Sequence, residues 1–198
     1  MKNNAPFIYF ETSDREQIAR YVELRRRVYL KEYPFLSADF GLADETDKLS
    51  RIVIAAQGGV VVGGARLTIS TPQCRQMLPL EEKGFDLKSC DALKDLGLGR
   101  KPYGEISRMA ASPESAHGFE ISGGLAYALA SLAAHLGLDV VFSICPAKPA
   151  RINRINAAKL GIGFRKYQDL PTVFGVDMAL CAFTGILKVF ATAGREAA

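Results

Sequence analysis

The chain has 198 residues, 48% of them hydrophobic and 23% charged, a composition that excludes an intrinsically disordered protein and favours one globular domain over residues 1–198. Its net charge of +4 is spread out, and the one basic run, Arg25 to Arg27, lies in a helical pattern, which argues against a nucleic-acid-binding protein. The four cysteines show no CxxC spacing and there are only two histidines, which argues against a zinc site or another metal site.

The signals for the cellular compartment favour a cytoplasmic protein. Free thiols are typical of a reducing compartment. Residues 1–6 lack the apolar core of a signal peptide, and no stretch is long and apolar enough for a membrane span. A weakly basic surface would suit an acidic carrier protein or a phosphorylated substrate.

The first quarter of the chain predicts a strand, a helix and a long loop. Residues 7–10 are aromatic and β-branched, which is typical of a strand. Ser13 has the position of an N-cap for a helix that runs to about residue 33 and buries one face, including Arg25. Pro34 ends this helix, and residues 35–48 form an irregular acidic stretch.

Residues 51–56 and 60–69 predict a β-hairpin with its turn at 57–59. Gly63 and Gly64 lie inside the second strand, which indicates a bulge or the close approach of another part of the chain. Residues 73–101 show no strong periodicity, and we expect them to cover the sheet with a short helical turn.

The second half of the chain predicts alternating strands and helices. The segments, in order, are a strand from 103, a helix over 115–136 that Gly123 and Gly124 keep narrow, a buried strand over 139–145, a helix over 149–160, two closing strands at 164–167 and 176–183 around a loop that contains Pro171, and a frayed helix over 184–198. This order predicts an α/β fold with a central mixed sheet and helices on both faces.

The central strand carries one carboxylate and one guanidinium, Glu105 and Arg108, among apolar and small neighbours. A charge in a buried strand is costly unless it is paired or has a catalytic role, so a structural ion pair and a catalytic role are both open.

No Walker, GxGxxG or GxSxG motif is present, and Cys145 has the context of an inert buried thiol. Acyl transfer to an amine could use buried charges alone, because it needs a base and a fixed oxyanion donor. The charges in buried contexts are Arg25, Glu45, Asp47, Arg66, Glu105 and Arg108.

Four short motifs occur in the order and at the separations seen in acyl-homoserine-lactone synthases, the autoinducer synthases. They are Leu24 to Tyr29, Glu45 to Asp47, Gly64 to Leu67, and Glu105 to Arg108. The chain resembles this family over most of its first 115 residues. The resemblance implies the GCN5-related N-acetyltransferase (GNAT) fold, with a twisted mixed sheet in which two parallel strands splay apart. It also implies no permanently bound cofactor and an acyl donor on the phosphopantetheine arm of acyl carrier protein, held near Met109, Ala110, Val141 and Phe142.

Three departures from these patterns refine the resemblance. Residues 115–120 do not match the phosphate loop of GNAT enzymes that use coenzyme A, which favours carrier protein as the donor. Phe35 stands where autoinducer synthases have a tryptophan, and Ser50 stands where they have a second aspartate. Both of these positions belong to the acceptor-binding part of autoinducer synthases. With these two changes the chain is similar to N-acyl amino acid synthases from soil-metagenome clones, which acylate an amino acid such as tyrosine.

We therefore expect an N-acyltransferase that moves a long-chain fatty acyl group from acyl carrier protein to the α-amino group of an amino acid, with tyrosine favoured. Glu105 would accept the ammonium proton, directly or through a water. Arg108 would orient the loop carboxylates or bind the acceptor carboxylate, and a bulge between these two residues would let both face one cleft. The remaining substrate-binding residues implied are Arg25 and Arg66, holding Glu45 and Asp47, with the aromatic residues Tyr29 and Phe35.

Three alternatives stay open from the sequence. The first is an acyl-homoserine-lactone synthase that uses S-adenosylmethionine, and the second is a coenzyme-A-dependent N-acetyltransferase. The third is a non-catalytic domain that binds acyl carrier protein or a fatty acyl ligand. The acceptor, the acyl chain length and the oligomeric state are not determined by the sequence.

Overall fold

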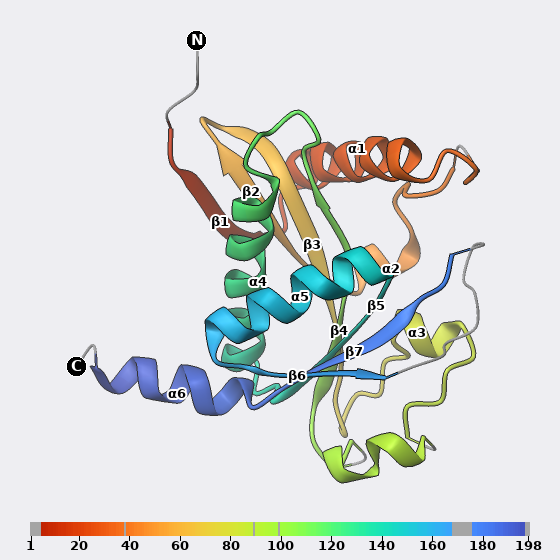
Figure 1. The fold of residues 1–198 in the computed structure, drawn as a ribbon, viewed down its shortest axis with the longest axis vertical. Coiled ribbons are helices and arrows are strands. Elements are labelled where there is room, and N and C mark those ends of the chain that lie inside the picture. The colour runs from red at the N-terminus through yellow and green to blue at the C-terminus, as the bar shows by residue number, and fades with distance from the viewer. Residues whose placement is uncertain (1–4, 38, 89, 99, 168–175, 197–198) are drawn as a thin grey trace. The chain divides into compact units, whose positions relative to one another are not determined.

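The computed structural model describes residues 5–37, 39–88, 90–98, 100–167 and 176–196. Contacts divide the chain into two compact units, Met1–Leu67 with Arg108–Leu129, and Thr68–Ser107 with Ala130–Ala198. The strands form a seven-stranded mixed sheet in the order β1-β2-β3-β4-β5-β7-β6, and β3 and β4 each contribute residues to both units (Figure 1). The expectation of a single domain stays a prediction.

The first unit holds the predicted strand, helix and hairpin. Asp14 caps the first helix by accepting a 2.9 Å hydrogen bond from the Gln17 N–H, so the prediction of Ser13 as the cap was wrong. The long acidic stretch contains a single helical turn that periodicity could not reveal. The elements are β1 (Phe7–Thr12), α1 (Arg15–Glu32), α2 (Glu45–Lys48), β2 (Arg51–Gln57), β3 (Val60–Ser70), β4 (Tyr103–Ala111) and α4 (Gly118–His135), the last three extending into the second unit.

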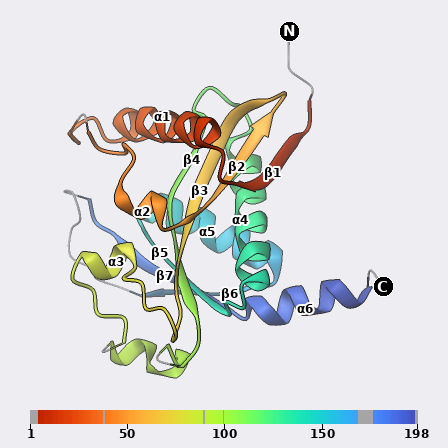
Figure 2. The ribbon, with the colours of Figure 1, turned by 180° about the vertical axis from the view of Figure 1, so that it is seen from behind.

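Gly63 and Gly64 let two helices approach opposite faces of β3. A Cβ atom at Gly64 would lie 2.5 Å from the Tyr21 ring of α1, and one at Gly63 would lie 2.6 Å from Ile121 of α4. Successive residues of a strand point to opposite faces, so α1 and α4 cover different sides, as Figures 1 and 2 show. The register with β2 also shifts beside Gly63, at Ala55. The close approach and the bulge predicted from this glycine pair are both confirmed.

The second unit covers its strands with an apolar segment on one side and a helix on the other. Leucines from residues 78–98 pack against Tyr103, Phe142 and Leu180, which confirms the covering role predicted for this region. Ala150 of α5 packs against Cys145 and Cys181. The elements are α3 (Pro79–Glu82), a 3₁₀ helix (Asp91–Leu96), β5 (Val140–Cys145), α5 (Ala147–Leu160), β6 (Gly163–Tyr167), β7 (Ala179–Thr184) and α6 (Ile186–Glu196).

The predicted loop with Pro171 lies outside the described residues. In the parts of the chain that are described, none of the helices combines the length and the apolar character needed to cross a bilayer.

The parallel pairing of β4 with β5 is short. It joins Tyr103–Glu105 to Val140–Phe142, and no further pairs follow among the described residues, although both strands continue. β5 instead keeps its full antiparallel register with β7 as far as Cys145. The two parallel strands therefore separate after Glu105, which is the splay that the resemblance to GNAT enzymes implied.

The close packing at Gly64 yields a test of the fold. Gly64→Ala should lower the free energy of unfolding by about 1–3 kcal/mol, because the added methyl group overlaps the fully buried Tyr21 ring. Urea denaturation measures this. Gly118→Ala is the matched control, since nothing lies within 4 Å of its Cβ position, and it should change stability by no more than about 1 kcal/mol. Equal stabilities of the two variants would contradict the packing.

Candidate active site

A buried arginine in α1 ties the acidic loop to the first unit. The Arg25 side chain has 0% exposure and makes a two-point contact with Asp47, Nη1 to Oδ1 at 2.7 Å and Nη2 to Oδ2 at 2.6 Å. Its Nε donates to the Gly41 carbonyl at 2.7 Å, and Nη2 also donates to the Leu42 carbonyl. The predicted pairing of Arg25 with Asp47 is confirmed by these contacts.

The single turn of α2 presents two carboxylates, Asp44 and Asp47. Each accepts a 3.0 Å hydrogen bond from the backbone N–H of the other, which is a capping box at the start of the turn. Arg66 of β3 is 3% exposed, and its Nη1 lies 2.6 Å from Asp44 Oδ1 and 3.0 Å from Asp47 Oδ1. Two buried arginines thus hold the pair of aspartates in place.

The expectation that Arg25 and Arg66 hold Glu45 was wrong. The Glu45 side chain is 84% exposed and pairs with Lys48 on the same turn, at 2.7 Å. Asp44 takes the place expected for Glu45, because an N-cap residue points its side chain back over the first turn. The signal for Asp44 was present in the sequence, since Asp44 and Asp47 stand three residues apart as a capping box requires.

Arg108 lies in β4 with an unusual backbone. Its φ is +57°, and it is the one non-glycine residue with positive φ among those the structure describes. The Tyr21 hydroxyl donates to its carbonyl at 2.6 Å. The bulge expected between Glu105 and Arg108 stays a prediction. The Arg108 guanidinium lies over the Phe40 ring, 4.7 Å from its centroid, and its Nη2 is 3.6 Å from Asp44 Oδ2.

Aromatic residues surround this part of the first unit. The Tyr29 hydroxyl donates to the Met109 carbonyl at 3.3 Å, and the Tyr29 ring lies 5.7 Å from the ring of Phe40. Burial raises the pKa of Tyr29 despite nearby arginines, so the phenol stays neutral. Phe35 is 62% exposed and contacts the ring of Tyr33. Sequence reasoning missed Phe40, because no periodicity marks burial in an irregular segment.

Other expected residues near β4 differ in burial. Ala110 is buried, whereas Met109 is half-buried, and its sulfur accepts a weak 3.8 Å hydrogen bond from the Ser122 hydroxyl. Val141 and Phe142 of β5 are fully buried in the second unit. Their roles in substrate binding stay predictions.

Glu105 belongs to the second unit and has no exposed surface. Its Oε2 accepts a 2.8 Å hydrogen bond from the Leu80 backbone N–H, at the first turn of α3. Glu105 is also the last residue of β4 in register with β5, opposite Phe142. A buried carboxylate thus stands where the parallel strands begin to separate.

Cys145 at the end of β5 has the character of an inert thiol. The contact with the Cys181 thiol and burial raise the pKa of Cys145, and Asn153 Nδ2 lies 3.6 Å from its sulfur. A protonated thiol is a poor nucleophile. Among the described residues, no three His, Cys, Asp or Glu side chains gather as metal ligands.

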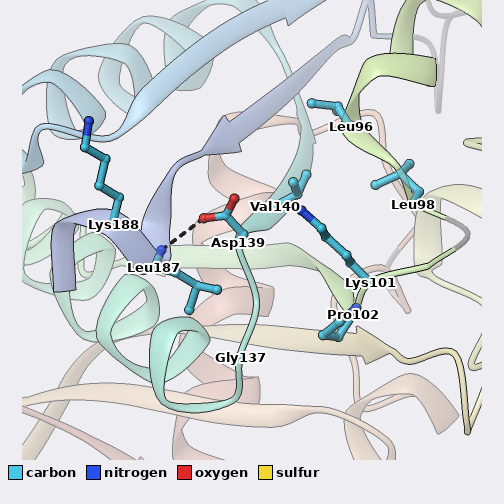
Figure 3. A pocket seen from close by; sticks show the side chains of 9 residues that line it. All are labelled: Leu96, Leu98, Lys101, Pro102, Gly137, Asp139, Val140, Leu187 and Lys188. Carbon is cyan, nitrogen blue, oxygen red and sulfur yellow. Dashed lines mark hydrogen bonds between the residues drawn. The ribbon is translucent and has the colours of Figure 1, made fainter. Parts of the chain in front are cut away.

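A cavity of about 410 Å³ lies in the second unit, where β4 and β5 begin (Figure 3). Asp139, which lines the cavity, accepts a 3.1 Å hydrogen bond from the Leu187 N–H at the start of α6. None of the predicted site residues lines it. The lining residues are Leu96, Leu98, Lys101, Pro102, Gly137, Asp139, Val140, Leu187 and Lys188.

The aspartate pair yields a prediction about pH. Burial alone would raise the pKa of Asp47, but hydrogen bonds and charge from Arg25, with the Asp44 N–H and Arg66, hold it below its ordinary value. A lowered pKa stabilises the fold above the unfolded value of about 3.9, and this contribution is lost as the pH falls through the lower folded pKa. Asp47→Asn should therefore reduce the acid dependence of the free energy of unfolding.

The same variant should lose about 3–5 kcal/mol of stability at pH 7, because it removes the carboxylate that pairs with the buried Arg25. Urea denaturation at several pH values measures both effects. Glu45→Gln, the same change on the same turn, should stay within about 0.5 kcal/mol, since its carboxylate is exposed. A loss in Glu45→Gln that matches Asp47→Asn would contradict the assignment.

The fold is shared with solved structures of acyltransferases. FeeM, an N-acyl amino acid synthase from uncultured soil microbes, is similar over 95% of both chains, with a TM-score of 0.65 and 14% identity. BjaI, a coenzyme-A-dependent acyl-homoserine lactone synthase, is similar over 95% of this chain and 89% of its own, with a TM-score of 0.65 and 17% identity. An aminoglycoside 6′-acetyltransferase of type Ii is similar over 90% and 97%, with a TM-score of 0.55 and 16% identity.

No protein-family model matches the sequence, and no curated protein matches it. Identities this low show a common fold. The chain has the GNAT-like α/β fold of autoinducer synthases, N-acyl amino acid synthases and N-acetyltransferases, and the resemblance read from its four motifs is confirmed in its architecture.

Proposed function

We propose that the chain is an N-acyltransferase that moves a long-chain fatty acyl group from acyl carrier protein to the α-amino group of an amino acid, with tyrosine favoured. The observation that carries this proposal is Glu105, a fully buried carboxylate at the last paired position before β4 and β5 separate. A base is the one group that amide formation from a thioester and an ammonium ion cannot do without. The resemblance of the sequence and the shared fold support the same chemistry.

The separating strands suit an extended thioester arm. Beyond Glu105 and Phe142, the backbone of β4 and β5 is no longer engaged in the parallel register between them. Backbone groups at such a gap can hydrogen-bond an extended ligand as an added strand would. The amides of a phosphopantetheine arm have this character. The arm would reach Glu105 with its thioester carbonyl.

In the reaction, the acceptor nitrogen attacks the thioester carbonyl carbon, a C–N bond forms and the C–S bond breaks. Before the attack, one ammonium proton passes to Glu105, directly or through a water, and the second proton that the nitrogen loses on forming the amide protonates the departing thiolate. Holding thioester and amine together would supply most of the acceleration, and the base would contribute roughly 10²–10⁴-fold.

Acidic groups at the start of α4 support carrier protein over coenzyme A as the donor. Glu120 in the first turn pairs with His117 at 3.1 Å, and Glu114 accepts from the Ser112 hydroxyl at 2.7 Å. A helix N-terminus attracts phosphate, but the Glu120 carboxylate in its first turn repels it, whereas Glu114 is paired with Arg27 at 3.5 Å. Coenzyme A carries a diphosphate and a further phosphate, whereas an attached phosphopantetheine carries one phosphodiester. The fold does not discriminate between the donors, because BjaI shares it.

Ser50 supports an amino acid over S-adenosylmethionine as the acceptor. Its hydroxyl donates to the Thr46 carbonyl at 2.7 Å, at the end of α2, where a second aspartate would place a negative charge. That negative charge would stabilise the sulfonium cation of S-adenosylmethionine, whereas an amino acid without a second cation has no group that it would stabilise. Serine at position 50 therefore favours an amino acid as the acceptor.

The product test is mass spectrometry of lipid extracts from a bacterial host that expresses the chain. We expect long-chain N-acyl amino acids above an empty-vector control, with N-acyl tyrosine prominent. Acyl homoserine lactones would instead identify S-adenosylmethionine as the acceptor. The absence of any acylated amine would leave the non-catalytic binding domain as the better interpretation.

The role of Glu105 is tested by Glu105→Gln. The amide oxygen can still accept from the Leu80 N–H, so stability should change little, whereas turnover should fall by roughly 10²–10⁴-fold. Rates of purified protein with palmitoyl carrier protein and tyrosine measure this, beside urea denaturation. Glu82→Gln on the exposed side of α3 is the control and should keep full activity. Near wild-type turnover in Glu105→Gln would leave Glu105 with a structural role in supporting α3.

A further inference from the structure

The cavity of about 410 Å³ lies wholly within the second unit and is separate from the place proposed for the thioester (Figure 3). Its lining comes from the starts of β4 and β5 and the residues before them, together with the start of α6 and the end of the 3₁₀ helix. Glu105 is the last of the three positions at which β4 pairs with β5, about 10 Å further along β4 than Pro102. The cavity is therefore a second candidate site.

Most of the cavity wall is apolar. Leu98 and Val140 are buried in the core of the second unit, and Leu96 packs against that core. Leu187 is 38% exposed, so the apolar surface continues from the core to the mouth of the cavity. Ligand pockets of about 300–1,000 Å³ combine such a wall with a few polar groups that fix the orientation of the ligand.

Two lysines and one aspartate supply the charges of the lining, which gives it a net charge of +1. The Asp139 carboxylate is already engaged, because it accepts from the Leu187 N–H at the positive end of α6. The Lys101 side chain runs from the start of β4 toward Val140, and among the described residues no ion pair joins its ammonium to a carboxylate. Lys188 also lines the cavity, but its ammonium points away from Lys101 (Figure 3). Lys101 is therefore the cation that a ligand in the cavity meets.

We propose that this cavity binds a long-chain carboxylate, with the carboxylate at Lys101 and the chain between Val140 and Leu187. A neutral apolar ligand would make no use of the ammonium, and a small anion would leave the apolar wall in contact with water. The net charge of +1 matches a single carboxylate. A methylene group occupies about 30 Å³, close to the share of one water molecule, so the cavity accommodates roughly a dozen chain carbons.

Isothermal titration of the full chain with decanoate and with decanol, which keeps the chain but lacks the charge, tests the inference. Decanoate should bind about 3- to 10-fold more tightly than decanol, the range of one partly exposed charge-assisted contact. Lys101→Gln should abolish this preference, whereas Lys94→Gln should keep it. Lys94 is the matched control, because it is an exposed lysine of the same unit that pairs with Asp91 and does not line the cavity.

A second variant shows whether the ligand occupies this cavity or the proposed active site. The affinity for decanoate should stay within about 2-fold in Glu105→Gln, because Glu105 does not line the cavity. The inference is overturned if decanoate does not bind, if Lys101→Gln binds it as tightly as Lys94→Gln does, or if Glu105→Gln changes its affinity more than Lys101→Gln does. These titrations involve no turnover, so their failure leaves the proposed function untouched, and the failure of that function leaves them valid.

Free fatty acids and N-acyl amino acids share the chemistry of a chain that ends in one carboxylate. Titration with N-decanoyl-tyrosine distinguishes these two sources. Tighter binding of N-decanoyl-tyrosine than of decanoate, again dependent on Lys101, identifies the product of the proposed reaction as the ligand. Tighter binding of decanoate identifies a free fatty acid.

Discussion

A fully buried arginine must find its negative charge inside the protein, and Arg25 imposes this condition on the first unit. Asp47 of α2 supplies that charge, and the carbonyls of Gly41 and Leu42 accept further hydrogen bonds from the Arg25 guanidinium. These contacts fasten the segment between α1 and β2 at several points. Phe40 and Asp44, the neighbours of the Arg108 guanidinium, are carried by that same segment.

β4 carries two charged residues, Glu105 and Arg108, and each contacts a different irregular segment. Glu105 accepts a hydrogen bond from the backbone of α3, while Arg108 faces the loop that precedes α2. Neither segment contains a long helix, because α2 and α3 are single turns. One strand thus carries both charges, and a short turn provides the surroundings of each. In many enzymes, binding and catalytic residues likewise lie on loops that a rigid scaffold positions.

Much of the fold could be predicted because its signals are periodic. The hairpin, α1, α4 and α5 carry strand or helix periodicity, and the glycine pair in β3 indicated close packing correctly. The site was predicted less well, since the acidic loop has no period to show which side chains point inward. Glu45 was placed where Asp44 lies, and Phe40 was not recognised at all.

The backbone of Arg108 restricts which residues can replace it in evolution. Glycine, asparagine and aspartate adopt positive φ with the least strain, and β-branched residues adopt it badly. None of the residues that suit the backbone carries a positive charge. Replacement of Arg108 by one of these residues would therefore relieve the backbone strain and remove the positive charge at the same time.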